Sequence, residues 1–180
     1  EDQPDQVVMA WDDNKPWGTI KSASKIDELT GMLPCEFLVL KDRGLDLSEV
    51  LLATAGGPDS DLSAEVARAL RTEVGSEISL LHVVEGPDQR EEGERFLTEW
   101  AADRGLDDAN IIVDDSGNVE AAIQREAEQR SLVLIGATEK GLLSRLASDS
   151  LHLDVVNHVD CSVLLAEKPY ERSLRQRLFG

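Results

Sequence analysis

The sequence predicts an α/β protein: an open parallel five-stranded sheet with helices on both faces, preceded by a partial β-α-β copy of the same unit. Two observations predict it. Short apolar runs alternate with helical patterns almost without interruption from residue 49 onward, which favours parallel strands joined by helices. The runs are mostly apolar, as is typical of strands buried on both faces. A ligand crevice is then expected at the carboxyl ends of the strands.

The expected strands end in turn-forming residues. Gly-Gly-Pro closes the first run and Gly-Pro closes the second, and both sequences interrupt extended structure. The five expected strands are Glu49–Ala55, Ile78–Val84, Asn110–Val113, Leu132–Ala137 and Ser162–Ala166.

Helical spacing of apolar residues marks the connections between these strands. Leu62, Val66 and Leu70 recur at this spacing. They follow Asp59 and Ser60, either of which can cap a helix. The other expected helices are an acidic one carrying Phe96, Leu97 and Trp100, a short one at Val119–Gln129 and a longer one at Leu142–Val159.

The charge balance excludes one class of partner. Eighteen Lys and Arg against 36 Asp and Glu give a net charge of −18, which repels the phosphates of nucleic acid. The acidic residues are dispersed and only six basic residues are Lys. Such a surface suits a protein that stays soluble in concentrated salt, where charges are screened within about 3 Å. We therefore expect a salt-adapted source, although an ordinary acidic protein would share these features.

The first 43 residues repeat the end of the chain. When Gln6–Asp42 is laid on Leu132–Lys168, no gap is needed and every expected strand and helix keeps its place. The matched positions include Cys35 with Cys161, Ser22 with Ser148, Ser24 with Ser150, and Phe37–Leu40 with Val163–Ala166. We interpret this as a repeat of one unit, although two β-α-β units of equal length can also align by chance.

Three parts of the chain are therefore expected. Residues 1–43 are the last third of a truncated upstream copy, residues 44–169 are a complete domain, and residues 170–180 are a basic amphipathic tail. The tail either packs on its own acidic domain or docks on an acidic partner or membrane surface.

The fragment formed by the first 43 residues is too small to bury a core alone. We expect its strand at Phe37–Leu40 to dock on the edge strand Ser162–Ala166 of the same chain, or to exchange with a second chain and form a homodimer.

No enzyme constellation is visible in the sequence. The three histidines lie on separate elements, and His82, on an apolar strand, is expected to be a hydrogen-bonded core residue. Asp114 and Asp115 are expected to solvate a loop rather than to bind metal, and no metal site is expected. Cys35 and Cys161 are expected to be buried free thiols. We therefore expect a protein that is not an enzyme.

The order of elements, the turn after the first strand, the segment Leu81–Val84 and the loop Ile135–Thr138 resemble the universal stress protein family. The resemblance covers residues 47 to 168. It implies the adenine nucleotide α-hydrolase-like fold and a nucleotide crevice. The positions implied to contact the nucleotide are Ala55, Gly56, Val83, Gly136, Ala137, Thr138, Gly141 and Ser150.

The nucleotide motif of the family is damaged in this sequence. Binding members carry Gly-x-x-Gly, nine residues and Gly-Ser or Gly-Thr after the fourth strand, and an Asp ends the first strand. Gly136 and Ser150 match, but Glu139 and Asp149 replace glycines and Ala55 replaces the Asp. Two carboxylates would repel a triphosphate unless Mg²⁺ bridged them. No cofactor is therefore expected, with ATP or AMP as the alternative.

The resemblance also implies a cellular setting. Tandems of such domains occur behind the membrane region of amino-acid or cation transporters. We therefore expect a cytoplasmic regulatory module of an archaeal, salt-adapted transporter, tethered to the cell membrane. Its partners would be the upstream domain and the membrane region of the same chain. The alternative is a stand-alone universal stress protein that binds ATP or AMP.

Overall fold

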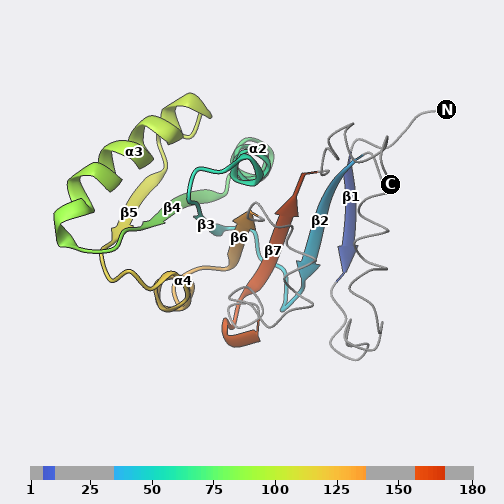
Figure 1. The fold of residues 1–180 in the computed structure, drawn as a ribbon. Coiled ribbons are helices and arrows are strands. Elements are labelled where there is room, and N and C mark those ends of the chain that lie inside the picture. The colour runs from blue at the N-terminus through green and yellow to red at the C-terminus, as the bar shows by residue number, and fades with distance from the viewer. Residues whose placement is uncertain (1–5, 11–34, 137–156, 169–180) are drawn as a thin grey trace, which may run out of the picture.

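The computed structural model of the chain describes residues 6–10, 35–136 and 157–168. At its centre is a seven-stranded sheet with the order β1-β2-β7-β6-β3-β4-β5 (Figure 1). The strands are β1 (Gln6–Ala10), β2 (Glu36–Lys41), β3 (Glu49–Ala53), β4 (Glu77–Val83), β5 (Asn110–Asp114), β6 (Leu132–Gly136) and β7 (Ser162–Glu167). The described neighbours are parallel except for β2 and β7, which are antiparallel.

The predicted fold class is confirmed. Strands β3 to β7 are the five expected strands, and their bounds differ from the expected ones by at most two residues at each end. The first strand, β3, ends at Ala53 rather than at Ala55, and β6 ends at Gly136 rather than at Ala137. Strands β1 and β2, from the first 43 residues, extend this sheet, so both parts of the chain share one continuous sheet.

The described helices follow the expected alternation with strands. They are α2 (Pro58–Val74), the 3-10 helix η2 (Pro87–Gln89), α3 (Arg90–Asp103) and α4 (Val119–Ala127). The expectation that Asp59 or Ser60 caps the first of these helices is wrong. Gly57 is the N-cap of α2, because Pro58 has a backbone conformation suited to the first helical turn and starts the helix earlier. The expected helix at Leu142–Val159 lies almost wholly outside the described residues.

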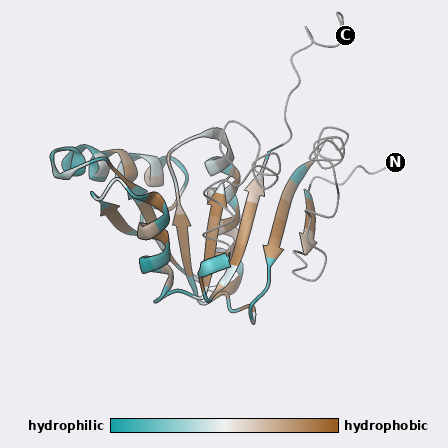
Figure 2. Ribbon diagram, turned by 60° about the horizontal axis from the view of Figure 1, so that its bottom comes forward, coloured by the Kyte–Doolittle hydropathy of each residue, from teal (hydrophilic) through white to brown (hydrophobic). Residues whose placement is uncertain are grey.

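Helices cover both faces of the sheet, with α2 and α3 on one side and α4 on the other (Figure 1). Leu52 and Leu80 pack with Leu97 of α3. Leu51, the neighbour of Leu52, points to the opposite face and packs with Ile123 of α4. Successive residues of a strand point to opposite faces, so burial on both sides explains the unbroken apolar runs. Figure 2 shows this as strands that are brown along most of their length.

The antiparallel pairing of β2 with β7 joins the two parts of the chain. The structure confirms that these two edge strands pair within one chain. Val39 lies directly opposite Leu165, and these two residues occupy equivalent positions in the sequence repeat. A pairing in which equivalent residues face each other is what a twofold relation between the two copies requires. Leu38 adds a contact with Leu62 of α2.

The segment after β2 is fastened to the complete domain. The backbone N–H of Arg43 donates to Ser162 Oγ at 2.9 Å. Its guanidinium donates to the carbonyl oxygens of Asn157 and Val159. Lys41, which is buried, donates from Nζ to Asn157 Oδ1 at 3.2 Å. These bonds hold the connection beside the start of β7, so the β2–β7 pairing is supported at one end by side chains.

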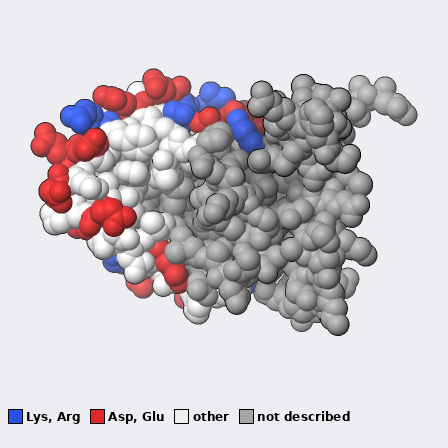
Figure 3. Space-filling model, in the orientation of Figure 1, with Lys and Arg blue, Asp and Glu red and all other residues white. Residues whose placement is uncertain are grey.

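Acidic residues are dispersed over the surface of the described part. Figure 3 shows carboxylates spread around α3 and its neighbours instead of gathered in one patch. Cys35 is a buried free thiol, as expected, whereas Cys161 is a free thiol that is only half-buried. Burial raises the pKa of the Cys161 thiol. In the described ranges, no helix is both long and apolar enough to cross a bilayer.

Removal of residues 1–43 should raise the association state of the remaining chain. Without β2, the edge of β7 loses its backbone hydrogen-bond partners, and an unpaired edge strand recruits another strand. Two molecules could then pair β7 with β7, Leu165 facing Leu165. Sedimentation equilibrium in molar KCl should show a dimer. Removal of residues 1–5 alone leaves β1 and β2 in place and is the matched control. The same number of chains per particle for the two shortened proteins would contradict the proposed role of β2.

Candidate functional site

The sequence predicts a ligand crevice at the point where the order of the strands reverses in the sheet. Strand β3 lies between β4, which follows it in the chain, and β6, which comes much later. All three strands are parallel, so their carboxyl ends meet at one edge of the sheet. The strand that follows β3 in the chain, β4, lies on one side of this pair, and the next described strand after β6, β7, lies on the other. Ligands bind at such a reversal of strand order in open α/β sheets.

The turn after β3 uses its own polar groups. The backbone N–H of Gly56 donates to Thr54 Oγ1 at 3.0 Å, and the N–H of Thr54 donates to the carbonyl of Leu81 at 2.9 Å. Ala55 is exposed and Gly56 is half-buried. A methyl group at residue 55 offers no hydrogen bond to a ligand. The resemblance implies an aspartate at this position. Ala55 therefore leaves the turn after β3 without a side chain that could hydrogen-bond to a ligand.

An aromatic ring stands over this turn. A Cβ atom placed on Gly56 would lie 2.6 Å from Cζ of Phe96, far inside normal contact distance. The Phe96 ring also packs against His82, with 4.8 Å between the ring centroids. Phe96 belongs to α3 and lies far from Gly56 in the sequence, so sequence reasoning did not connect the two. Helix α3 thereby covers the turn after β3 with a side chain.

His82 is hydrogen-bonded, as predicted, but it is half-buried and is not part of the core. Its Nδ1 lies 3.0 Å from the carbonyl oxygen of Thr54. Since a carbonyl can only accept, Nδ1 carries the proton and donates it. The imidazole therefore links the end of β4 to the end of β3 and packs on Phe96.

The remaining predicted positions divide into two groups. Val83 and Gly136 end β4 and β6 at the same edge of the sheet as Ala55 and Gly56, and both are half-buried. Four predicted positions lie outside the described residues, as do the two carboxylates that replace glycines. These are Ala137, Thr138, Gly141 and Ser150, with Glu139 and Asp149.

The two aspartates at the end of β5 are held by arginines. Asp114 accepts a hydrogen bond from Arg125, and Arg90 donates to Asp115 at 2.9 Å. Burial raises the pKa of Asp114, but hydrogen bonds from Ser116 and Arg125 outweigh this and leave the pKa below its ordinary value. Within the described residues, no three His, Cys, Asp or Glu side chains converge on one point.

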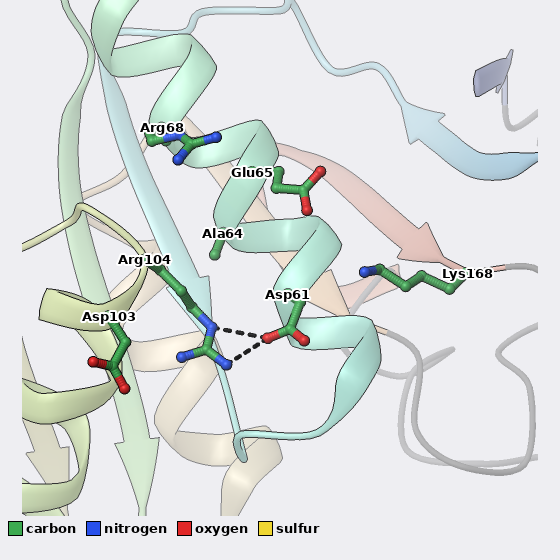
Figure 4. A pocket seen from close by; sticks show the side chains of 7 residues that line it. All are labelled: Asp61, Ala64, Glu65, Arg68, Asp103, Arg104 and Lys168. Carbon is green, nitrogen blue, oxygen red and sulfur yellow. Dashed lines mark hydrogen bonds and ion pairs between the residues drawn. The ribbon is translucent and has the colours of Figure 1, made fainter. Parts of the chain in front are cut away.

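A hollow runs along α2 and has a volume of about 400 Å³ (Figure 4). It is lined by Asp61, Ala64, Glu65, Arg68, Asp103, Arg104 and Lys168. Nε and Nη2 of Arg104 donate to Asp61 Oδ1 at 2.8 and 2.6 Å, and the Arg104 guanidinium lies 4.4 Å from the Trp100 ring centroid. Acidic and basic side chains balance in this cleft, so its charge favours neither an anion nor a cation.

Comparisons with known proteins agree with this fold. The model of the universal stress protein family matches residues 47–167. No curated protein sequence matches the chain.

Solved structures extend the likeness beyond the segment that the family model matches. A universal stress protein from Archaeoglobus fulgidus is similar over 93% of this chain, with 17% identity and a TM-score of 0.65. This chain spans 62% of that protein. The cytoplasmic domain of a prokaryotic cation chloride cotransporter is similar over 98% of this chain and 68% of its own, with 14% identity and a TM-score of 0.66. A universal stress protein in complex with cAMP is similar over 68% of this chain and 98% of its own, with 17% identity and a TM-score of 0.52.

Replacement of Gly56 by Ala should destabilise the protein by about 1–3 kcal/mol. Gly56 has a φ of +82°, which side-chain-bearing residues rarely adopt, and the new Cβ would meet Phe96. Gly57→Ala is the matched control, because a Cβ there meets nothing within 4 Å. Urea unfolding measures both variants. Equal losses would show that neither the conformation nor the Phe96 contact constrains this turn.

Proposed function

This chain belongs to the universal stress protein family, and from that premise we propose that it is a non-catalytic regulatory and interaction module in the cytoplasmic part of a membrane transporter. The likeness to the cytoplasmic domain of a cation chloride cotransporter supports the proposal. It extends over 98% of the chain and so reaches well beyond the family-matching residues. The transported solute would be an amino acid or a cation.

The observation that carries the regulatory part of the proposal is the chemistry of the turn after β3. Ala55 offers no polar group, the N–H of Gly56 is bonded to Thr54, and Phe96 lies over the turn. In the sequence, Glu139 and Asp149 add two carboxylates to the loop that would receive phosphate. Each like charge at 4–6 Å costs about 1–3 kcal/mol. These features favour a degenerate site that holds no nucleotide.

The described titratable groups near the crevice support a non-catalytic role. His82 donates Nδ1–H to Thr54 and packs on Phe96, so its ring is held as a structural link. Asp114 and Asp115 are bound by arginines. A general base needs a free position within hydrogen-bond reach of a substrate. The bonds these groups make favour structural roles for all three.

The setting follows from the same proposal. The chain would lie on the cytoplasmic side of the membrane, joined to the membrane region of its transporter, in a salt-adapted archaeal cell. Strand β7 already has a partner in β2 of the same chain. A homodimer through these edges would require exchange of residues 1–43 between two chains, and it is the alternative to the pairing within one chain.

A stand-alone protein that binds ATP or AMP is the second candidate. The family also contains separate proteins, and similar structures include a universal stress protein from Archaeoglobus fulgidus and one in complex with cAMP. The glycines Gly56 and Gly136, which allow close approach of a phosphate to the backbone, remain at the crevice. The two candidates differ in cellular location and in nucleotide affinity.

Cell fractionation tests the location. An antibody raised against residues 44–168 should detect its antigen in carbonate-washed membranes of the source cells, in a polypeptide far longer than 180 residues. Washing with carbonate removes proteins that are only adsorbed, so a fused module stays with the membrane. A short antigen that remains in the soluble fraction would contradict the transporter and favour the second candidate.

Calorimetry of the full chain with millimolar ATP and Mg²⁺ should show no binding or only weak binding. The combined substitutions Ala55→Asp, Glu139→Gly and Asp149→Gly should strengthen binding by about tenfold or more, because they return an anchor and remove two charges.

A second variant tests whether the mere loss of two negative charges strengthens ATP binding. Glu91→Gln with Glu92→Gln removes two carboxylates from the exposed side of α3. This variant should bind no better than the natural chain. Micromolar affinity of the natural chain for ATP or AMP would overturn the degenerate site.

A further inference from the structure

The sheet face that carries α2 continues beyond this helix onto β2 and β1. Ala166 of β7 lies opposite Leu38 of β2, and Leu38 lies opposite Val8 of β1. Residues that pair directly point to the same face of a sheet, and Leu38 contacts Leu62 of α2. Ala166, Leu38 and Val8 therefore form a row on the side of the sheet where α2 lies.

Burial decreases along this row with distance from α2. Ala166 is 2% exposed and Leu38 is 5% exposed, whereas Val8 is 62% exposed. A second row beside the first is also apolar and ends in an exposed residue. It consists of Leu164, Leu40 and Ala10. We refer to the outer residues of the two rows, Val8, Ala10 and Leu40, as the apolar shelf.

Charged side chains of α2 border the apolar shelf. The hollow along α2 reaches this border, because Lys168, the residue after β7, lines it together with Glu65 of α2. Figure 4 shows Lys168 extending from the end of β7 toward α2, on the side of the helix where Glu65 projects. The chain that follows Lys168 therefore starts beside both the charged hollow and the apolar shelf.

The segment that follows is the basic amphipathic tail, residues 170–180, which lies outside the described residues. Its apolar residues recur at helical spacing. They are Leu174, Leu178 and Phe179. Its charged residues are Glu171, Arg172, Arg175 and Arg177. The tail therefore combines an apolar side with charges of both signs and an excess of positive charge.

The length and charge of the tail fit the described surface. Neighbouring strands lie about 4.8 Å apart, so the shelf extends about 10 Å from β7 to β1. A helix of the tail's length spans about 16 Å, which is enough to cross the shelf. The lining of the hollow carries both signs of charge, as the tail does. The net charge of −18 attracts a basic segment to the rest of the chain.

We propose that the apolar shelf and the adjoining side of α2 are the docking surface of the chain's own tail, residues 170–180. The apolar side of the tail covers the shelf, and Arg172 lies beside Glu65. The docked tail crosses β7, β2 and β1, the strands that join the two parts of the chain. It removes the exposed aliphatic side chain of Val8 from water.

Two features favour the chain's own tail as the occupant over an external surface. The tail is joined to the border of the shelf at Lys168, and such a short connection gives it an effective concentration of about millimolar at the shelf. The acidic surface of the chain also repels the phosphates of an anionic membrane, which is the other surface suited to a basic amphipathic segment.

Thiol labelling of residue 8 in molar KCl tests the proposal. Val8→Cys with Cys161→Ser is introduced into residues 1–180 and into a chain shortened to residues 1–169. The new cysteine should react with a polar thiol reagent at least about fivefold faster in the shortened chain, because removal of the tail uncovers the shelf. Equal rates in the two chains would overturn the proposal.

Val74→Cys is the matched control for the labelling, since Val74 is 56% exposed and lies at the end of α2, away from the shelf. It should react equally fast with and without the tail.

Substitutions within the tail test which of its sides docks. Combining Leu174→Ser, Leu178→Ser and Phe179→Ser in the full chain should speed labelling at residue 8 as much as the deletion does. Ser173→Ala with Gln176→Ala changes the other side of the tail and should leave the rate unchanged. An unchanged rate in the triple variant would contradict docking through the apolar side.

Two further results would assign the tail to another surface and overturn the proposal. Protection of residue 8 that disappears on dilution would show that the tail of a second copy covers the shelf. Faster labelling of the full chain after addition of vesicles of phosphatidylcholine and phosphatidylglycerol would show that the tail prefers a membrane.

Discussion

The antiparallel pairing of β2 with β7 is the constraint on which the rest of the structure depends. A parallel domain that ended at β7 would leave a full edge of N–H and C=O groups without partners, together with the apolar side chains of that strand. The pairing satisfies these groups and places Val39 and Leu165 in one buried layer, at 4% and 3% exposure. Arg43 and Lys41 fasten the same junction from the side.

At the other end of the sheet's central strands, the polar groups are used within the fold. The polar groups at the carboxyl ends of β3 and β4 bond to one another: Gly56 to Thr54, and Thr54 to His82. Phe96 covers the turn that they form. By contrast, the edge of β1 keeps an exposed valine and an unpaired side within the described sheet.

Much of this could be predicted from the sequence, because strands buried on both faces leave an unbroken apolar signal. The five strands of the complete domain and the pairing of Phe37–Leu40 with Ser162–Ala166 were accessible in this way. The first residue of α2 was not predicted correctly. The helix begins at Pro58 with Gly57 as its N-cap, and not at the polar residues that follow them. The contact of Phe96 with Gly56 was not predictable either. Phe96 lies in α3, which connects β4 to β5, and no local pattern in the sequence indicates that this helix covers the turn after β3.

The central claim is that two equivalent strands meet within one chain about a twofold axis at Val39 and Leu165. Isotope-filtered NMR of a mixture of labelled and unlabelled protein measures this most directly. The account predicts contacts between the backbone Hα and HN atoms of Val39 and Leu165 within single molecules, and the pattern of an antiparallel pair on either side. Contacts shifted to another register, or found between molecules, would contradict it.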